Sequence, residues 1–223
     1  MRSLPLPLAL TARLTPVVVL ACAGWAMSSS PADDAKDTAA KENQTTQSGT
    51  ASTSGPSAAA VTRTYSAAPA PCTSVTTKTV TSLVPGAKTA GKEIPSTDTK
   101  LRRTCSWNAL KGYDYRWLDI SFEITESDAE ATSTYKDRLK EKSGGGAVPG
   151  LGDEGYSLVN LTTEDKQQTR EGTVIARVSN ALVVITYNGS DFESKKAPST
   201  DVINTGAIKA AKEAVAALQK TAG

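Results

Sequence analysis

The chain of 223 residues contains no histidine. This absence excludes a histidine-based catalytic triad, a histidine metal ligand and a histidine pH switch. The sequence also lacks a Walker loop, an EF-hand loop, a zinc-binding cysteine cluster and a G-x-S-x-G serine motif. We therefore predict a protein that is not an enzyme and that holds no cofactor and no metal.

A large net charge of either sign is also missing. The chain has 25 Lys and Arg against 23 Asp and Glu, and two of the basic residues, Arg2 and Arg13, lie in a segment that has the features of a leader. Without that leader the two signs balance. Nucleic-acid-binding domains carry an excess of basic residues, so we expect no nucleic-acid partner.

Cysteine is scarce, and the number of three cysteines is odd. The apolar run 14–21 follows Arg13, as in a secretory signal, and it ends in the residues Val-Leu-Ala before Cys22, which resembles the bacterial lipobox. In a lipobox the cysteine carries fatty acyl chains such as palmitate and becomes the first residue of the mature protein. We predict a lipoprotein signal peptide over residues 1–21 and lipidation at Cys22. The alternatives are an ordinary signal peptide cut nearby and an uncleaved N-terminal anchor.

Large apolar residues are rare between the leader and residue 71. Ser, Thr, Ala, Gly and Pro dominate residues 22–70, where Trp25, Met27, Val61 and Tyr65 are the exceptions. Such a segment cannot bury enough surface to offset its chain entropy. We predict a disordered tether with an end-to-end distance of about 40 Å. O-linked glycosylation of its Ser and Thr residues is left open.

Residues 101–124 show the strongest pattern in the chain. Two stretches, LRRTCSWNAL and YRWLDISFEI, alternate in side-chain character and are separated by the polar break KGYD. This period of two predicts a β-hairpin with one face in a core. Cys105 in the first strand is the one remaining partner for Cys72, so we predict a disulfide between them in an oxidising compartment, covered by Trp107.

Residues 71–223 as a whole predict an α+β extracytoplasmic domain. The predicted order is a short helix after Cys72, the hairpin, a helix opened by the capping box of Ser127 and Glu130 and ended by glycines 144–146, strands at 156–161, 173–178 and 182–187, and a last helix opened by residues 198–201. Residues 87–100 and 162–172 are predicted to be a surface loop and a polar reversal. The predicted fold is an antiparallel sheet of about five strands, packed by two or three helices and held by one disulfide.

A family resemblance rests on four motifs in a fixed order: Cys72, Thr104-Cys105-Ser106-Trp107, Gly150-Leu151-Gly152-Asp153-Glu154 and Arg177-Val178-x-Asn180. This order resembles an actinobacterial family of cell-envelope lipoproteins with a domain of unknown function, although Gly155 stands where the family commonly has a residue such as Ala. The resemblance implies a surface location, a disulfide and a binding or accessory role, and it transfers no catalytic residue. More distantly, the layout is similar to extracytoplasmic sensor domains of actinobacterial receptor kinases.

Five residues near the hairpin are candidates for binding. Tyr113, Tyr115 and Trp117 could form an aromatic rim, because partly exposed aromatic side chains favour sugars and protein anchors. Packing at a sheet edge is the alternative. Arg102 and Arg103 could bind an anionic lipid or polymer, or they could be strand charges that keep an edge from pairing.

Asp153 and Glu154 invite an acid/base or metal interpretation. Neighbouring residues on an extended backbone point to opposite faces, so we expect Asp153 to bind backbone N–H groups of its glycine-rich turn while Glu154 faces away.

Together these observations predict a lipid-anchored protein on the outer face of the bacterial cytoplasmic membrane. Its domain would be a non-catalytic module that binds an envelope protein, a glycan or a lipid. The alternative is a structural envelope component without a small-molecule ligand, and an enzyme is the least expected class.

Overall fold

The computed structural model describes residues 63–222. The predicted signal peptide, the predicted lipidation residue Cys22 and the predicted tether as far as residue 62 lie outside the described residues. Within residues 63–222, no helix is both long enough and apolar enough to span a bilayer.

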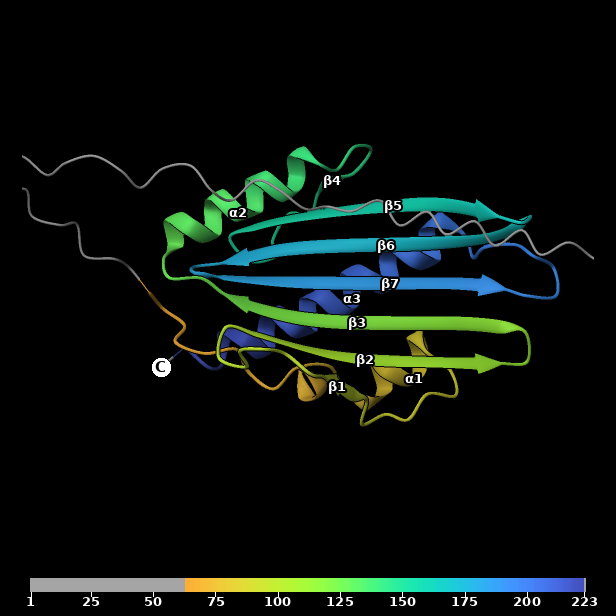
Figure 1. Ribbon diagram of the computed structural model, residues 1–223, viewed down its shortest axis with the longest axis horizontal. Coiled ribbons are helices and arrows are strands. Elements are labelled where there is room, and N and C mark those ends of the chain that lie inside the picture. The colour runs from red at the N-terminus through yellow and green to blue at the C-terminus, as the bar shows by residue number, and fades with distance from the viewer. Residues whose placement is uncertain (1–62, 223) are drawn as a thin grey trace, which may run out of the picture. The chain divides into compact units, whose positions relative to one another are not determined.

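Seven strands form one sheet in the order β1-β2-β3-β7-β6-β5-β4, and all neighbours are antiparallel (Figure 1). The strands are β1 (Lys92–Ile94), β2 (Arg102–Lys111), β3 (Asp114–Ile124), β4 (Gly146–Ala147), β5 (Glu154–Glu164), β6 (Gln167–Val178) and β7 (Ala181–Asp191). The helices are the short 3-10 helix η1 (Pro71–Thr73), α1 (Thr77–Leu83), α2 (Asp128–Lys140) and α3 (Thr200–Gln219).

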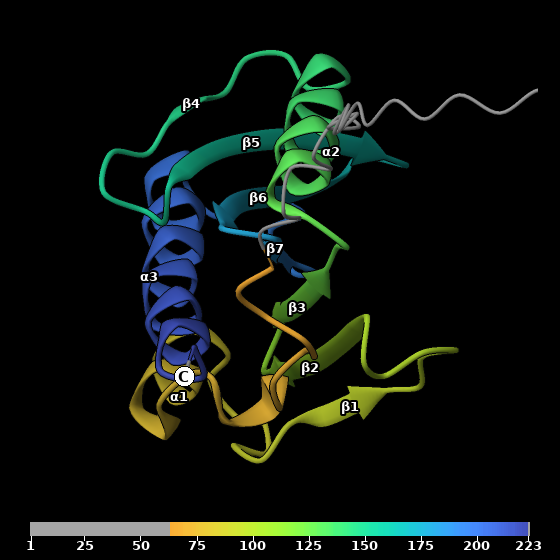
Figure 2. The same cartoon turned by 90° about the vertical axis from the view of Figure 1, so that its left-hand side faces the viewer.

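The helices divide between the two faces of the sheet (Figure 2). α1 and α3 lie on the face to which Leu118, Ile120 and Phe122 of β3 belong, which we call the inner face. α2 lies on the opposite or outer face, to which the alternate residues Trp117 and Asp119 belong.

The predicted sheet of about five strands is wrong, because the sheet has seven. The two extra strands, β1 and β4, are edge strands of three and two residues, which are too short to show alternation in the sequence. β1 lies within the predicted surface loop 87–100. The predicted polar reversal 162–172 is also mostly strand, because β5 and β6 continue through it to a tight turn at Asp165 and Lys166, whose φ angles are 47° and 69°.

The folded domain begins before residue 71, where we predicted that the tether ends. Tyr65 is buried with 4% of its surface exposed. The buried amide of Asn180 holds this segment: its oxygen accepts from the backbone N–H groups of Thr64 and Tyr65 (3.0 and 2.8 Å), and its nitrogen donates to the carbonyls of Tyr65 and Thr125 (2.9 and 2.8 Å). The sequence did not predict this contact, because Tyr65 is a single aromatic residue in a polar stretch.

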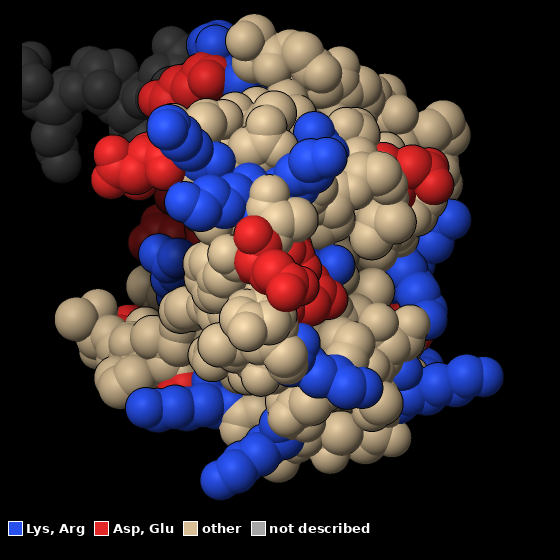
Figure 3. Space-filling view, turned by 90° about the vertical axis from the view of Figure 1, so that its right-hand side faces the viewer, with Lys and Arg blue, Asp and Glu red and all other residues tan. Residues whose placement is uncertain are grey.

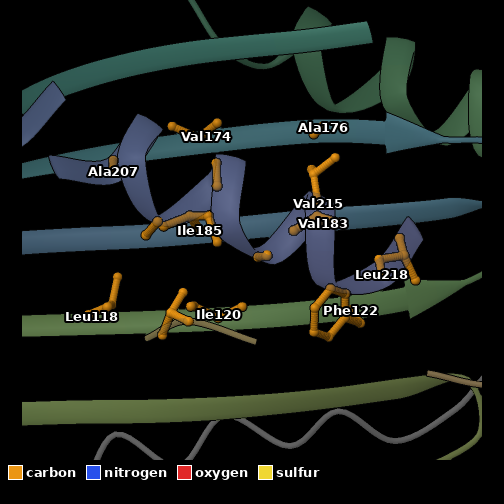
Figure 4. Close-up of a cluster of buried hydrophobic side chains, with 14 of the residues drawn as sticks. Leu118, Ile120, Phe122, Val174, Ala176, Val183, Ile185, Ala207, Val215 and Leu218 are labelled. Carbon is orange, nitrogen blue, oxygen red and sulfur yellow. The ribbon is translucent and has the colours of Figure 1, made fainter. Parts of the chain in front are cut away.

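The inner face forms the core with α3 (Figure 4). Apolar side chains alternate along β3, β6 and β7 and meet one side of the helix. That side is rich in alanine, and Ala207, Ala210, Ala211 and Ala214 are fully buried. Small side chains let the helix approach the sheet closely, so that α3 buries one whole side against the inner face.

The predicted disulfide between Cys72 and Cys105 is confirmed, with Cα atoms 5.1 Å apart. It fastens η1 to β2 on the inner face. Trp107 is 1% exposed, and its indole N–H donates to the carbonyl of Thr89 (3.1 Å). At Gly91, where φ is +67°, a Cβ atom would lie 2.6 Å from both the Cys105 sulfur and the Trp107 ring. Glycine there lets the chain close over the bridge.

α2 begins at the predicted cap, Ser127, whose hydroxyl accepts from the N–H of Glu130 (3.1 Å). The Glu130 carboxylate accepts from the N–H of Glu126 (2.8 Å), one residue before the bond of a regular capping box. The helix ends at Lys140, before the glycines that we expected to end it. Its Tyr135 and Leu139 pack on the outer face against a small cluster of Tyr156, Ile175, Leu182 and Val184.

Candidate functional site

The register of the sheet orders the outer face into rows of side chains that cross β2, β3, β7, β6 and β5. The two rows nearest the β6–β7 turn include the residues that α2 packs against. The first of these rows is Arg102, Glu123, Leu182, Arg177 and Glu154, and the second is Thr104, Ser121, Val184, Ile175 and Tyr156. Among the described residues, α2 is the one helix on this face, and it covers this end.

Three further rows continue toward the β2–β3 and β5–β6 turns, and we call them the open platform. The first row is Ser106, Asp119, Thr186, Thr173 and Leu158. The second, the central row, is Asn108, Trp117, Asn188, Glu171 and Asn160. The third is Leu110, Tyr115, Ser190, Thr169 and Thr162. No helix of residues 63–222 lies over these rows.

The platform carries hydrogen-bond acceptors and donors but no basic side chain. Its central row holds three amides, a carboxylate and an indole, and all five side chains are exposed or half-buried. The three rows contain the carboxylates Asp119 and Glu171 and no Lys or Arg. The nearest cation in register is Lys92, which lies beside Ser106 in the edge strand β1.

Two of the three predicted aromatic residues lie together on the platform, with one that the sequence analysis missed. The ring of Tyr115 lies between Trp117 and Phe192, with centroid distances of 6.4 and 6.0 Å. Tyr113 is separate: it lies at the β2–β3 turn, 57% exposed, and its carbonyl accepts from the N–H of Phe192. Phe192 follows the end of β7 in a polar segment, and no sequence pattern linked it to the hairpin.

An ion–dipole contact fixes the orientation of the tryptophan. The indole N–H of Trp117 donates to the carboxylate of Asp119 at 2.6 Å. Burial, and secondarily the charge of Asp119, raise the pKa of the nearby Tyr115 phenol. The aromatic end of the platform is therefore held in place by neighbours of the same strand.

Arg102 and Arg103 do not form one anion site, because strand alternation sends them to opposite faces. Arg102 lies on the outer face, 3.7 Å from Glu123. Arg103 donates two hydrogen bonds to Glu93 of β1, at 2.6 and 2.8 Å. Its hydrogen bond is the main cause that lowers the pKa of Glu93. Each arginine has an acidic neighbour, and Arg103 ties the edge strand to the sheet.

Asp153 and Glu154 also have structural partners, and the expectation that they face apart is wrong. Both bind Arg177: the guanidinium donates to Glu154 at 2.7 Å and to Asp153 at 3.0 Å. Asp153 further accepts from the N–H of Ser179 at 2.7 Å, so it ties its loop to the β6–β7 turn and not to its own turn. Gly152, with φ at +65°, allows this approach, because a Cβ atom there would collide with the Arg177 carbonyl. Two of the four motifs of the family resemblance, residues 150–154 and 177–180, therefore meet in space.

Two grooves border the open platform. A groove of about 550 Å³ follows the β5–β6 hairpin and is lined by polar residues alone: Asn160, Thr162, Glu164, Asp165, Gln167, Thr169 and Glu171. A second, of about 410 Å³, lies between the β1–β2 connection and the sheet and is lined by Ile94, Pro95, Ser96, Thr97, Arg102, Thr104 and Asp119. Asn160 and Glu171 of the central row line the first groove, and Asp119 of the first platform row lines the second.

A third groove, of about 440 Å³, lies between α2 and the glycine-rich loop before β5. Asp153 and Glu154 line it, yet their carboxylates are engaged by Arg177. Within residues 63–222 no cluster of three or more acidic, cysteine or histidine side chains could hold a metal ion. Figure 3 shows the end of the molecule with the β2–β3 and β5–β6 turns, where basic and acidic groups are intermixed and no continuous basic surface forms.

No protein-family model matches the chain, and no curated protein sequence matches it. A crystal structure from Bacteroides thetaiotaomicron is similar over part of the fold, with 11% sequence identity and a TM-score of 0.30. The similarity covers 50% of this chain and 50% of that chain. A similarity at this level defines neither a family nor a function, so the site is interpreted from its own chemistry.

Proposed function

We propose that this chain is a membrane-anchored extracytoplasmic lipoprotein, and that its domain is a non-catalytic binding module of the cell envelope. It would be held at the outer face of the cytoplasmic membrane by acyl chains on Cys22, as in the actinobacterial family that its motifs resemble. The observation that carries the proposal is the open platform, where half of one sheet face keeps polar and aromatic side chains without a covering helix.

The composition of the platform favours binding over a purely structural role. Here a half-buried tryptophan is held by Asp119 and surrounded by amides and hydroxyls, and partly exposed aromatic residues with fixed orientations are the usual anchors of binding sites. Because Arg177 engages Asp153 and Glu154, the acidic pair supports a structural contact better than acid/base catalysis.

Cell fractionation tests the anchoring half of the proposal. Two acyl chains give stable membrane attachment, so Cys22→Ser should move the protein from the membrane fraction to the soluble fraction. A variant that stays in the membrane fraction would show that the segment is an uncleaved anchor.

Native mass spectrometry of the full-length protein, purified in detergent from its own host, tests the binding half. We expect a bound molecule whose occupancy falls in Trp117→Ala and is unchanged in Tyr113→Ala, which removes an exposed aromatic residue outside the platform. A protein that carries nothing in any variant would be a structural component instead.

A further inference from the structure

We infer that the open platform binds a neutral, linear glycan chain that lies along the central row. This inference rests on the proposed function as a binding module, because it names the class of ligand for the same surface.

The side chains of the central row have the chemistry that sugars require. Amides both donate and accept hydrogen bonds, and carboxylates accept them, so Asn108, Asn188, Glu171 and Asn160 can pair with the hydroxyls of successive sugar rings. Trp117 offers an indole face to the C–H side of a ring. Because neighbouring strands are about 4.8 Å apart, a row across five strands spans about 19 Å, which is the scale of a short oligosaccharide.

Charge argues against anionic ligands. The three rows contain Asp119 and Glu171 and no Lys or Arg, so a phosphate-bearing headgroup or polymer would meet repulsion without a paired cation. An acyl chain or other apolar ligand would meet amides and hydroxyls that it cannot pair, and unpaired polar groups are costly to bury. A neutral ligand with many hydroxyl groups avoids the charge repulsion and can also pair with the amides and hydroxyls of the platform.

Ser106 is a polar residue beside the central row whose hydroxyl no described residue pairs. It is 8% exposed, and its register places it on the outer face directly across from Asp119. Its hydroxyl is covered by protein atoms, so a ligand would pair with it only after a neighbouring side chain moved aside.

The platform is also preorganised for an extended ligand. Asp119 fixes the Trp117 indole, and a ligand that finds its contacts already oriented loses less free energy on binding. The last two residues of the row, Glu171 and Asn160, also line the groove of about 550 Å³, which continues along the β5–β6 hairpin toward its turn and is polar throughout. A glycan that bends at Glu171 could continue there.

A glycan array and calorimetry test the inference. The probes are linear neutral and linear anionic oligosaccharides, applied to the full-length protein in detergent, and calorimetry then measures the strongest neutral ligand. We expect binding to neutral members. Trp117→Ala and Asn188→Ala should each weaken it by at least about tenfold, whereas the matched aromatic control Tyr113→Ala should bind as the wild type. The thermal melting of each variant shows that it is folded.

The failures are distinguishable. Binding of neutral glycans that Trp117→Ala and Asn188→Ala leave unchanged would place the site elsewhere and overturn the inference. A second failure is an array to which nothing binds, or only anionic members bind, while host-purified protein carries a basic peptide or a lipid that Trp117→Ala releases. In that case the inferred ligand class is wrong, but the proposed function as a binding module stands. An empty array together with host-purified protein that carries nothing overturns both.

Discussion

The two faces of the sheet are built from alternate residues of the same strands, yet they are completed differently. On the inner face β7 presents Val183, Ile185 and Tyr187, all buried, along its whole length under α3. On the outer face the same strand changes from Leu182 and Val184 under α2 to polar residues beyond it. The covering helix ends where the apolar residues end, so the open half is specified by the sequence of the strands themselves.

The difference shows how a rigid base can carry an exposed surface. Several platform residues have a neighbour in their strand that points into the inner core. Asn188, for example, follows Tyr187, which is 2% exposed and donates its hydroxyl hydrogen to the carbonyl of Leu83 at 2.8 Å. The inner face fixes the backbone from which the outer side chains project. Substitutions should therefore affect stability through the inner face and binding through the open platform.

The largest effect on stability is expected from the disulfide on the inner face. Replacing Cys72 and Cys105 together by Ala removes a bridge with a sequence separation of 33. The chain-entropy estimate for a loop of that size is about 4 kcal/mol. Urea unfolding of the exported protein measures it, and a reducing agent should destabilise the wild type but not the variant. Equal unfolding midpoints for all of these samples would contradict the prediction.

The sharpest test of the comparison uses two positions of the same face of β7. Leu182→Ala should cost about 3 kcal/mol, because Leu182 is fully buried under α2 and the helix cannot fill the cavity. Thr186→Ala, on the platform, should cost less than about 0.5 kcal/mol. Urea unfolding of both variants measures the two values. If Thr186→Ala destabilises as much as Leu182→Ala, the open half is part of the core and the platform does not exist.

The β6–β7 turn should respond next. Asp153→Ala removes the acceptor of the Ser179 N–H, which is an exposed hydrogen bond, and should cost about 1 kcal/mol. Glu154→Ala should cost less, because Glu154 accepts only from Arg177, a partly exposed contact of the kind that contributes little. Thermal melting compares the two variants. If Asp153→Ala melts like the wild type and yet loses ligand binding, this turn is a site and its structural interpretation fails.

The hairpin could be predicted from the sequence because its signal is local. The alternation over residues 101–124 gave strands that the structure places at Arg102–Lys111 and Asp114–Ile124. The edge strands β1 and β4 could not be found, because a strand of two or three residues has no period. β5 and β6 were predicted too short. In β6, Thr169 and Glu171 lie on the outer face, and the residues between and after them, Arg170 and a glycine, lie on the inner face. Because neither face is apolar there, the sequence shows no alternation of polar and apolar residues.

The candidate site could be predicted only in its aromatic part. Trp117 and Tyr115 stand out in one strand, whereas Asn108, Glu171 and Asn188 lie in three other strands and look like ordinary surface residues. Their common row follows from the order β2-β3-β7-β6 and from the register of each pair. No local pattern contains that information, because it depends on which distant strands become neighbours.

The smallest effect concerns a carboxylate that joins two helices of the inner face, and it depends on pH. Glu213 of α3 accepts hydrogen bonds from the N–H of Thr76 (2.8 Å) and the hydroxyl of Thr79 (2.5 Å) at the start of α1. Burial by itself would raise the pKa of Glu213, but these hydrogen bonds outweigh it and lower the pKa below the usual 4.5. A lowered pKa in the folded state means that the contribution to stability is present above pH 4.5 and is lost as the pH falls through the folded-state pKa.

Glu213→Gln removes the titrating charge and keeps the size of the side chain. Because the two hydrogen bonds go to different carboxylate oxygens, the single amide oxygen can keep the bond from Thr76, while the amide NH2 group can donate to the Thr79 hydroxyl. The variant should be less stable than the wild type by about 1 kcal/mol at pH 7, and the difference should shrink below pH 4.5. Urea unfolding at a series of pH values measures the difference, with the exposed Glu126→Gln as the matched control. A difference that is the same at pH 3 and pH 7 would mean that the charge of Glu213 does not join α1 to α3, and that the inner face is held by packing alone.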